Sequence, residues 1–105
     1  MSTPSKTVLT VSELNQSTQR LLEECFPAIW VEGEISNLVR PTSGHIYFTL
    51  KDPKAQIRCA MFKMHNRKLG FTLKDGMHVI MKARVSLYEG SGDFQLLAEH
   101  LEEAG

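Results

Sequence analysis

The fold is decided by residues 29–62, which read IWVEGEISNLVRPTSGHIYFTLKDPKAQIRCAMF. This stretch predicts three successive strands, and residues 45–51 alternate most clearly. Ile46, Phe48 and Leu50 occupy one side of that strand, and His45, Tyr47, Thr49 and Lys51 occupy the other. An alternation of period two is typical of a half-buried strand whose aliphatic side faces the core.

The third predicted strand, residues 56–62, continues the pattern. Ile57, Cys59 and Met61 share its inward side, and Gln56, Arg58, Ala60 and Phe62 share its outward side. The two outward sides together carry rings and cations, namely His45, Tyr47, Lys51, Arg58 and Phe62. Aromatic rings interleaved with cations on an exposed sheet suit stacked bases and phosphates. The alternative for Tyr47 and Phe62 is that a ring lies flat over the rim of the sheet and holds the fold.

Composition places the chain among ordinary globular proteins. Its 105 residues suffice for one domain, with 42% apolar and 23% charged residues. No apolar run approaches the roughly 20 residues of a membrane span, and Met1–Lys6 lacks the apolar core of a secretory signal. We therefore expect a cytoplasmic protein with no membrane partner. Cys25 and Cys59 are expected to be buried free thiols.

The formal net charge of zero conceals a segregation along the chain. Residues 37–84 hold ten lysines and arginines against Asp52 and Asp75, a net charge of +8, whereas the segments before and after carry −3 and −5. A basic middle with acidic ends concentrates positive potential on part of the surface. This is the electrostatic pattern of a nucleic-acid binder, and a solvated lysine-rich surface is the alternative.

A helix is predicted before the strands. Thr10 and Glu13 form a capping box at its start, and Pro27 ends it because the residue before a proline disfavours helical geometry. One face of this helix is formed by Val11, Leu14, Thr18, Leu21, Leu22 and Cys25. A helix of this length is not stable alone. Its apolar stripe is therefore expected to pack on the domain, with self-association as the alternative.

Two residues of the first strand, Trp30 and Gly33, need their own interpretation. Gly33 in the strand interior indicates a bulge or a sharp bend, which would let the strand serve two parts of a curved sheet. Trp30 either packs against the N-terminal helix or stacks on a base.

The rest of the chain completes the predicted architecture. Residues 63–69 form a short basic helix ending at Gly70, a fourth strand begins near Met77, and a glycine-rich loop over 89–93 leads to a fifth strand over 94–101. We expect residues 102–105 to end without a packed closing element. The prediction is a mainly β protein, a five-stranded OB-fold barrel with an N-terminal helix and a short helix between strands three and four. Residues 1–27 are assigned to the tail and helix and 28–105 to the barrel, whose strand two–three face and flanking loops bind oligonucleotides or oligosaccharides.

At VSELN, FPAIWVEGEISNLVRPTSGHIYFTLKD and QIRCAMF the sequence resembles the N-terminal domain of the exodeoxyribonuclease VII large-subunit family. The resemblance implies part of a bacterial enzyme that degrades single-stranded DNA and has small subunits, with the nuclease centre and the small-subunit contacts in a C-terminal part missing here. It transfers substrate binding to Arg40, Ser43, His45, Tyr47, Arg58, Phe62 and Arg84. Three further cations complete the predicted nucleic-acid-binding set, Lys51, Lys63 and Arg67.

No catalytic residue or metal site is predicted within this chain. Mg²⁺ takes oxygen ligands, and the basic segment offers only Asp52 and Asp75, both in predicted turns. The histidines and cysteines show no metal-ligand spacing. We therefore expect the chain alone to be inactive and without a cofactor, and the metal dependence of the parent enzyme stays open. The alternative functions are a protein-interaction OB domain and an RNA-binding one.

Overall fold

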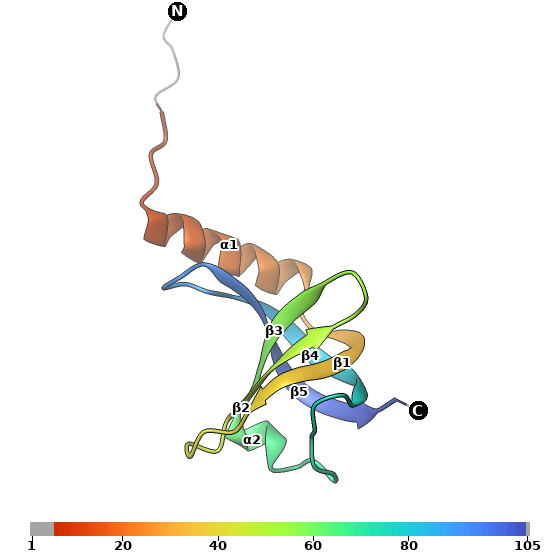
Figure 1. Cartoon of the computed structure of the whole chain (residues 1–105). Coiled ribbons are helices and arrows are strands. Elements are labelled where there is room, and N and C mark those ends of the chain that lie inside the picture. The colour runs from red at the N-terminus through yellow and green to blue at the C-terminus, as the bar shows by residue number, and fades with distance from the viewer. Residues whose placement is uncertain (1–5, 105) are drawn as a thin grey trace, which may run out of the picture.

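The computed structural model describes residues 6–104 as a closed β-barrel with two helices. Its elements are α1 (Val11–Cys25), β1 (Ile29–Val39), β2 (Ile46–Lys51), β3 (Gln56–Met61), α2 (Lys63–Asn66), β4 (His78–Tyr88) and β5 (Asp93–Glu103). The strands follow the order β1-β2-β3-β5-β4 around the barrel. Figure 1 shows α1 lying across the β4–β5 hairpin and α2 at the opposite end of the barrel. The predicted five strands and the position of both helices are confirmed.

β1 curves around the barrel and serves two neighbours, as the sequence predicts. Its residues 29–34 pair with β4 and its residues 34–39 pair with β2. Gly33 lies at this crossing, where an added Cβ would approach the Leu50 Cγ to 2.8 Å and the Lys51 carbonyl oxygen to 2.9 Å. The absence of a side chain at Gly33 therefore allows β1 and β2 to come close together.

The irregularity in β1 lies further along the strand than Gly33. The pairing of β1 with β2 shifts between Ser36 and Val39, and Asn37 within this interval has a φ of 52°. Asparagine tolerates this left-handed conformation better than most residues. Gly33 thus marks a close approach of two strands, and the bulge predicted there occurs at Asn37 instead.

The barrel interior holds the aliphatic side chains that the alternation predicts. Ile46, Phe48 and Leu50 of β2 are buried, and so are Val79, Met81, Ala83 and Val85 of β4. Ala60 is also buried, although its position in β3 predicts an outward side chain. The reason is local, because this small residue lies between the larger Tyr47 of β2 and Leu97 of β5.

The two cysteines are both free, but only Cys59 is buried. Burial raises the pKa of the Cys59 thiol to about 12, since the thiolate would lose its hydration inside the barrel. Cys25 is exposed at the last residue of α1. The prediction of two buried thiols is therefore wrong for Cys25, which lies on a side of the helix that the barrel does not cover.

α1 begins with the predicted capping box. The Thr10 Oγ1 accepts from the Glu13 N–H, and the Thr10 N–H donates to the Glu13 Oε1, both at 3.1 Å. The second bond lowers the pKa of the Glu13 carboxyl. At the other end the Phe26 N–H donates to the Leu22 carbonyl at 2.8 Å, directly before Pro27. Both helix ends thus lie where the sequence predicts them.

The face that α1 turns to the barrel agrees with the predicted one only at Thr18 and Leu22. The side chains less exposed than the rest are Asn15, Thr18, Gln19 and Leu22. Val11, Leu14 and Leu21 of the predicted apolar stripe are exposed, and no residue of α1 is fully buried. The barrel surface under α1 presents polar backbone atoms of the β4–β5 hairpin, so the amides of Asn15 and Gln19 join Leu22, which packs against the core, in the contact.

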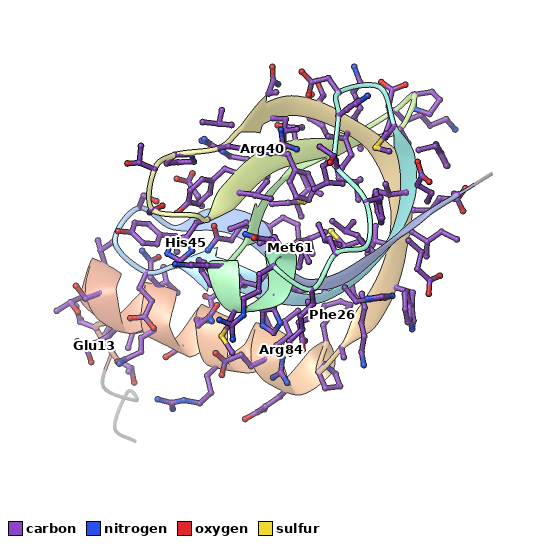
Figure 2. All side chains as sticks on the ribbon, turned by 90° about the horizontal axis from the view of Figure 1, so that it is seen from below. Glu13, Phe26, Arg40, His45, Met61 and Arg84 are labelled. Atoms are coloured by element: carbon purple, nitrogen blue, oxygen red, sulfur yellow. The ribbon has the colours of Figure 1, made fainter. Side chains whose placement is uncertain are left out.

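α2 is a single turn that crosses the lower opening of the barrel, as the view from below shows (Figure 2). The Asn66 side-chain amide donates to the Gly44 carbonyl at 2.8 Å and to the Met61 carbonyl at 3.0 Å. These bonds join the helix to the β1–β2 loop and to the end of β3. The helix ends at Asn66, earlier than the predicted 63–69. Neither helix in residues 6–104 has the length and apolar character needed to cross a membrane.

The C-terminal strand is longer than predicted. β5 continues through Glu102 and Glu103, which pair with Ile80 and Val79 of β4, and the Ala104 N–H donates to the His78 carbonyl at 2.9 Å. The expectation of an unpacked ending is thus wrong up to Ala104. Residue 105 and residues 1–5 of the assigned N-terminal tail lie outside the described part of the chain.

Candidate nucleic-acid interface

The outer face of the β2–β3 hairpin forms the floor of the candidate site. Its cross-strand pairs are Tyr47 with Ala60, Thr49 with Arg58, and Lys51 with Gln56. The two strands join through a tight turn in which the Asp52 Oδ1 accepts from the N–H groups of Lys54 and Ala55, each at 2.8 Å. These bonds lower the pKa of the Asp52 carboxyl. The turn fixes the register, so Tyr47 and Arg58 share one surface.

A groove of about 630 Å³ lies over this face. One wall comes from the end of β1, and the facing wall comes from the end of β4 and the start of β5. Its lining residues are Asn37, Val39, Tyr47, Phe48, Thr49, Gln56, Arg58, Cys59, Tyr88, Asp93 and Gln95. We call this feature the β2–β3 groove. The groove thus brings residues of β1, β2 and β3 together with residues of β4 and β5.

Both tyrosines of the chain line the β2–β3 groove. Tyr47 is 40% exposed and Tyr88 is 60% exposed, so both rings keep accessible faces. Tyr47 belongs to the predicted set, whereas Tyr88 does not. The sequence feature that could have indicated Tyr88 is its outward-facing position at the end of the fourth strand, directly before the glycine-rich loop. Two accessible rings in one groove can stack on unpaired bases.

Arg58 is the cation of the groove, and Asp93 is its acid. Within residues 6–104 no ion pair involves Arg58. Asp93 accepts from the Ser91 hydroxyl at 2.7 Å, which ties its carboxylate to the β4–β5 loop. A phosphate is therefore attracted to the Arg58 side of the groove and repelled from the Asp93 side.

A second group of predicted residues lies beside α2, on the continuation of the same β2–β3 face. The rings of His45 and Phe62 meet edge to face, with centroids 5.3 Å apart. The Lys63 N–H donates to the His45 Nδ1 at 3.0 Å, so a neutral His45 ring carries its proton on Nε2. Phe62 is still 38% exposed. Its ring therefore supports His45 and also presents surface to solvent.

The remaining predicted residues near α2 are Ser43, Lys63 and Arg67, all of which are exposed. The Ser43 Oγ accepts from the His45 N–H at 3.4 Å, within the β1–β2 loop. The structure thus places five predicted residues around α2 and two, Tyr47 and Arg58, in the groove.

Three predicted cations have other partners. Lys51 pairs with Glu34 at 3.4 Å, and Arg84 pairs with Glu99 at 3.0 Å. The Arg40 guanidinium donates to the Leu73 carbonyl, beneath the barrel. Figure 2 shows Arg40 and Arg84 on opposite sides of the barrel. None of the three lines the groove, because a neighbouring acid or carbonyl directs each side chain elsewhere.

Trp30 lies outside the groove on the outer face of β1. It is 56% exposed, and its ring meets that of His100 edge to face with centroids 6.1 Å apart. A ring this exposed does not pack beneath α1, so the packing interpretation of Trp30 is wrong. The base-stacking interpretation stays a prediction.

The described residues contain no cluster of three or more His, Cys, Asp or Glu side chains arranged to hold a metal ion. The nearest concentration of acids lies in a separate cavity lined by Glu32, Glu34 and Asp52. There the His78 Nε2 lies 2.7 Å from the Glu32 Oε1, and Lys51 pairs with Glu34. Glu32 and Glu34 are thus engaged with basic side chains, and Asp52 with the backbone of its own turn.

A closed five-stranded barrel with an aromatic groove over strands two and three defines a nucleic-acid-binding module of the OB-fold class. The chain belongs to the family described as OB-fold nucleic acid binding domain, whose model matches residues 9–102. The predicted fold class is thereby confirmed.

Three relatives at 53–57% identity have the same name. The chain is similar to the exodeoxyribonuclease 7 large subunits of Azotobacter vinelandii, at 57% identity over 93% of this chain, and of Pseudomonas aeruginosa, at 56% over 93%. The large subunit of Thioalkalivibrio sulfidiphilus is 53% identical over the whole chain. The chain spans 21–24% of the length of these relatives. The predicted resemblance is confirmed.

Solved structures share the fold at low identity. A replication protein A heterotrimer bound to single-stranded DNA matches 74% of this chain and 57% of its own chain, with a TM-score of 0.59 and 10% identity. The asparaginyl-tRNA synthetase of Entamoeba histolytica matches 74% of this chain and 20% of its own, with a TM-score of 0.61 and 15% identity. These likenesses concern the barrel alone.

Proposed function

We propose that this chain binds single-stranded DNA in the β2–β3 groove. The observation that carries the proposal is the placement of Tyr47 and Tyr88 on an open groove together with Arg58, which forms no ion pair within residues 6–104. The rings stack on bases, and the guanidinium neutralises a phosphate. Lys63 and Arg67 beside α2 extend the positive surface along the same face.

The identity of the relatives supports DNA as the substrate class and a larger enzyme as the context. We propose that the chain presents single-stranded DNA to a bacterial exodeoxyribonuclease of the type that its relatives name. The chain covers about a fifth of such a protein. The nuclease centre and the contacts with small subunits are therefore assigned to the part that this chain does not span, and the site of action to the cytoplasm.

Titration of the chain with labelled single-stranded DNA, single-stranded RNA and duplex DNA over a range of salt tests this function. If about three phosphates are neutralised, the logarithm of the affinity falls with the logarithm of the salt concentration at a slope of about −2. We expect single-stranded DNA to bind more tightly than duplex. An affinity that does not change with salt favours the protein-interaction function, and a preference for RNA favours the RNA-binding one.

A protein contact through α1 is the second candidate function. Val11, Leu14 and Leu21 form an exposed apolar stripe on a side of the helix that the barrel leaves open. Such a stripe suits self-association of two copies of the chain. Sedimentation over a range of concentrations tests it: association that disappears in Leu14→Lys but persists in Gln16→Lys supports this contact, and a monomer at all concentrations rejects it.

A further inference from the structure

Two amide side chains make the hydrogen bonds between α1 and the β4–β5 hairpin. The Asn15 Nδ2 donates to the Glu89 carbonyl at 2.9 Å. The Gln19 Oε1 accepts from the Leu87 N–H, and the Ser86 hydroxyl donates to the same oxygen at 3.4 Å. Both amides therefore bind the main chain of the hairpin on either side of Tyr88.

Gln19 supplies the hydrogen-bond acceptor that a neighbouring strand would otherwise provide to the end of β4. β1 pairs with β4 only as far as Ala83, so the last residues of β4 have no neighbouring strand on that edge. The Gln19 Nε2 donates to the Glu23 Oε1 at 2.8 Å, which turns the amide so that its oxygen faces Leu87. A backbone N–H that is partly shielded from water needs an acceptor, and the Gln19 Oε1 is the acceptor for the part-buried Leu87 N–H.

Asn15 holds the loop beyond Tyr88. An added Cβ at Gly92 would lie 3.4 Å from the Asn15 amide nitrogen, so the helix and the loop are in close contact. The loop itself closes through the Gly92 N–H, which donates to the Tyr88 carbonyl at 2.6 Å. Tyr88 is thus fixed by its own loop and by both helix amides, while its ring stays exposed in the groove.

We infer that Asn15 and Gln19 are positioning residues for nucleic-acid binding, although neither lines the groove. This inference rests on the proposed function of the β2–β3 groove. α1 fixes the backbone around Tyr88 before the ligand arrives, so binding does not have to order this hairpin. Without the two amides the end of the hairpin samples more conformations. Binding must then order the hairpin around Tyr88, and this free-energy cost weakens the affinity.

The variants Gln19→Leu and Asn15→Ala remove the two amides, and Gln16→Ala is the matched control on the exposed side of the same helix. We expect Gln19→Leu to bind single-stranded DNA about fivefold more weakly than the parent, the lower range for the loss of one stacked base. Asn15→Ala should have an effect in the same direction, and Gln16→Ala should bind like the parent.

A double-mutant cycle with Tyr88→Ala separates positioning from general destabilisation. If Gln19 acts through Tyr88, the double variant binds no more weakly than Tyr88→Ala alone. The double substitution Gln19→Glu with Glu23→Gln keeps an acceptor oxygen for the Leu87 N–H and a donor amide at position 23, so it should bind more tightly than Gln19→Leu. The exchange adds no net charge, and faster hydrogen exchange at the Leu87 amide in Gln19→Leu reports the loosened hairpin directly.

The outcomes distinguish this inference from the proposed function. If Tyr47→Ala and Tyr88→Ala weaken binding while the Asn15 and Gln19 variants bind like the parent, the inference is overturned and the function stands. The inference is also overturned if Gln19→Leu weakens DNA binding by the same factor in the parent and in the Tyr88→Ala variant. If neither tyrosine variant changes binding, both the function and the inference are overturned. Should Gln19→Leu fail to fold, Asn15→Ala carries the same cycle.

Discussion

Tyr47 and Arg58 lie on adjacent strands of one face, and we expect them to contribute to binding through different interactions. A base stacked on Tyr47 contributes roughly 1–3 kcal/mol whatever the salt concentration, whereas Arg58 acts through release of counterions. We expect Tyr47→Ala to weaken binding at every salt concentration. Arg58→Ala should reduce the magnitude of the salt slope by about 0.7, as measured by titrations in parallel.

Melting curves of these variants provide the control. A ring that packs on the fold costs about 3–5 kcal/mol when it is truncated to alanine, and a solvent-facing ring costs far less. Because Tyr47 is 40% exposed, its loss should lower the melting temperature only slightly. If Tyr47→Ala is as stable as the parent and binds as tightly, the binding face lies elsewhere.

The thiol of Cys59 gives a prediction about pH and reactivity. Its pKa of about 12 in the folded chain exceeds the ordinary 9.0, so folding favours the protonated form. This contribution to stability is present below pH 9 and is lost as the pH rises through 12. At mildly alkaline pH iodoacetamide should modify Cys25 alone, and mass spectrometry should detect a second label only after unfolding. Two labels on the folded chain would contradict the buried position of Cys59.

At the scale of elements, β1 depends on Gly33. A Cβ at this position meets the backbone of β2, which cannot move as a flexible side chain can. We expect Gly33→Ala to lower the free energy of unfolding by about 1–3 kcal/mol, measured by urea denaturation. Gly70→Ala is the matched control, since nothing lies within 4 Å of its added Cβ. Equal midpoints for the two variants would show that β1 and β2 can separate without cost.

Strand alternation predicted the elements of the barrel better than helix periodicity predicted the contact of α1. In β2 the period of two is enough to place Ile46, Phe48 and Leu50 in the core, because a strand in a barrel has one interior side. The periodicity of α1 identifies an apolar stripe but not the direction in which it points. That direction depends on unpaired backbone atoms near Leu87, which become visible only once β1 is known to end opposite Ala83.

The sequence predicts the residues that β2 and β3 contribute to the candidate site, but not those from the end of β4. Tyr47 and Arg58 follow from the alternation of neighbouring strands in a hairpin. Tyr88 comes from the far end of β4, and its place on the groove depends on the closure of the barrel. The partners of Arg40 and Arg84 are likewise distant in sequence, namely the Leu73 carbonyl and Glu99. The prediction failed where residues far apart in the sequence come into contact, because the sequence pattern does not reveal such contacts.

For the whole molecule, the chain is expected to bind without cleaving. Residues 6–104 contain no group of three or more His, Cys, Asp or Glu side chains that could hold a metal ion. Incubation of labelled single-stranded DNA with purified chain, with and without Mg²⁺, should leave the substrate intact on a denaturing gel. Digestion that copurifies with the chain and disappears in His45→Ala would contradict this expectation.

The barrel closes where β3 runs parallel to β5, along the three pairs Arg58 with Gln95, Cys59 with Leu96, and Ala60 with Leu97. This junction completes the ring of strands, and it joins segments far apart in the chain. Arg58 and Gln95 also line the groove, so DNA bound there as proposed lies over the outside of this junction. A ligand that binds only the closed barrel favours the closed state by mass action, so occupancy of the groove should raise the melting temperature of the chain.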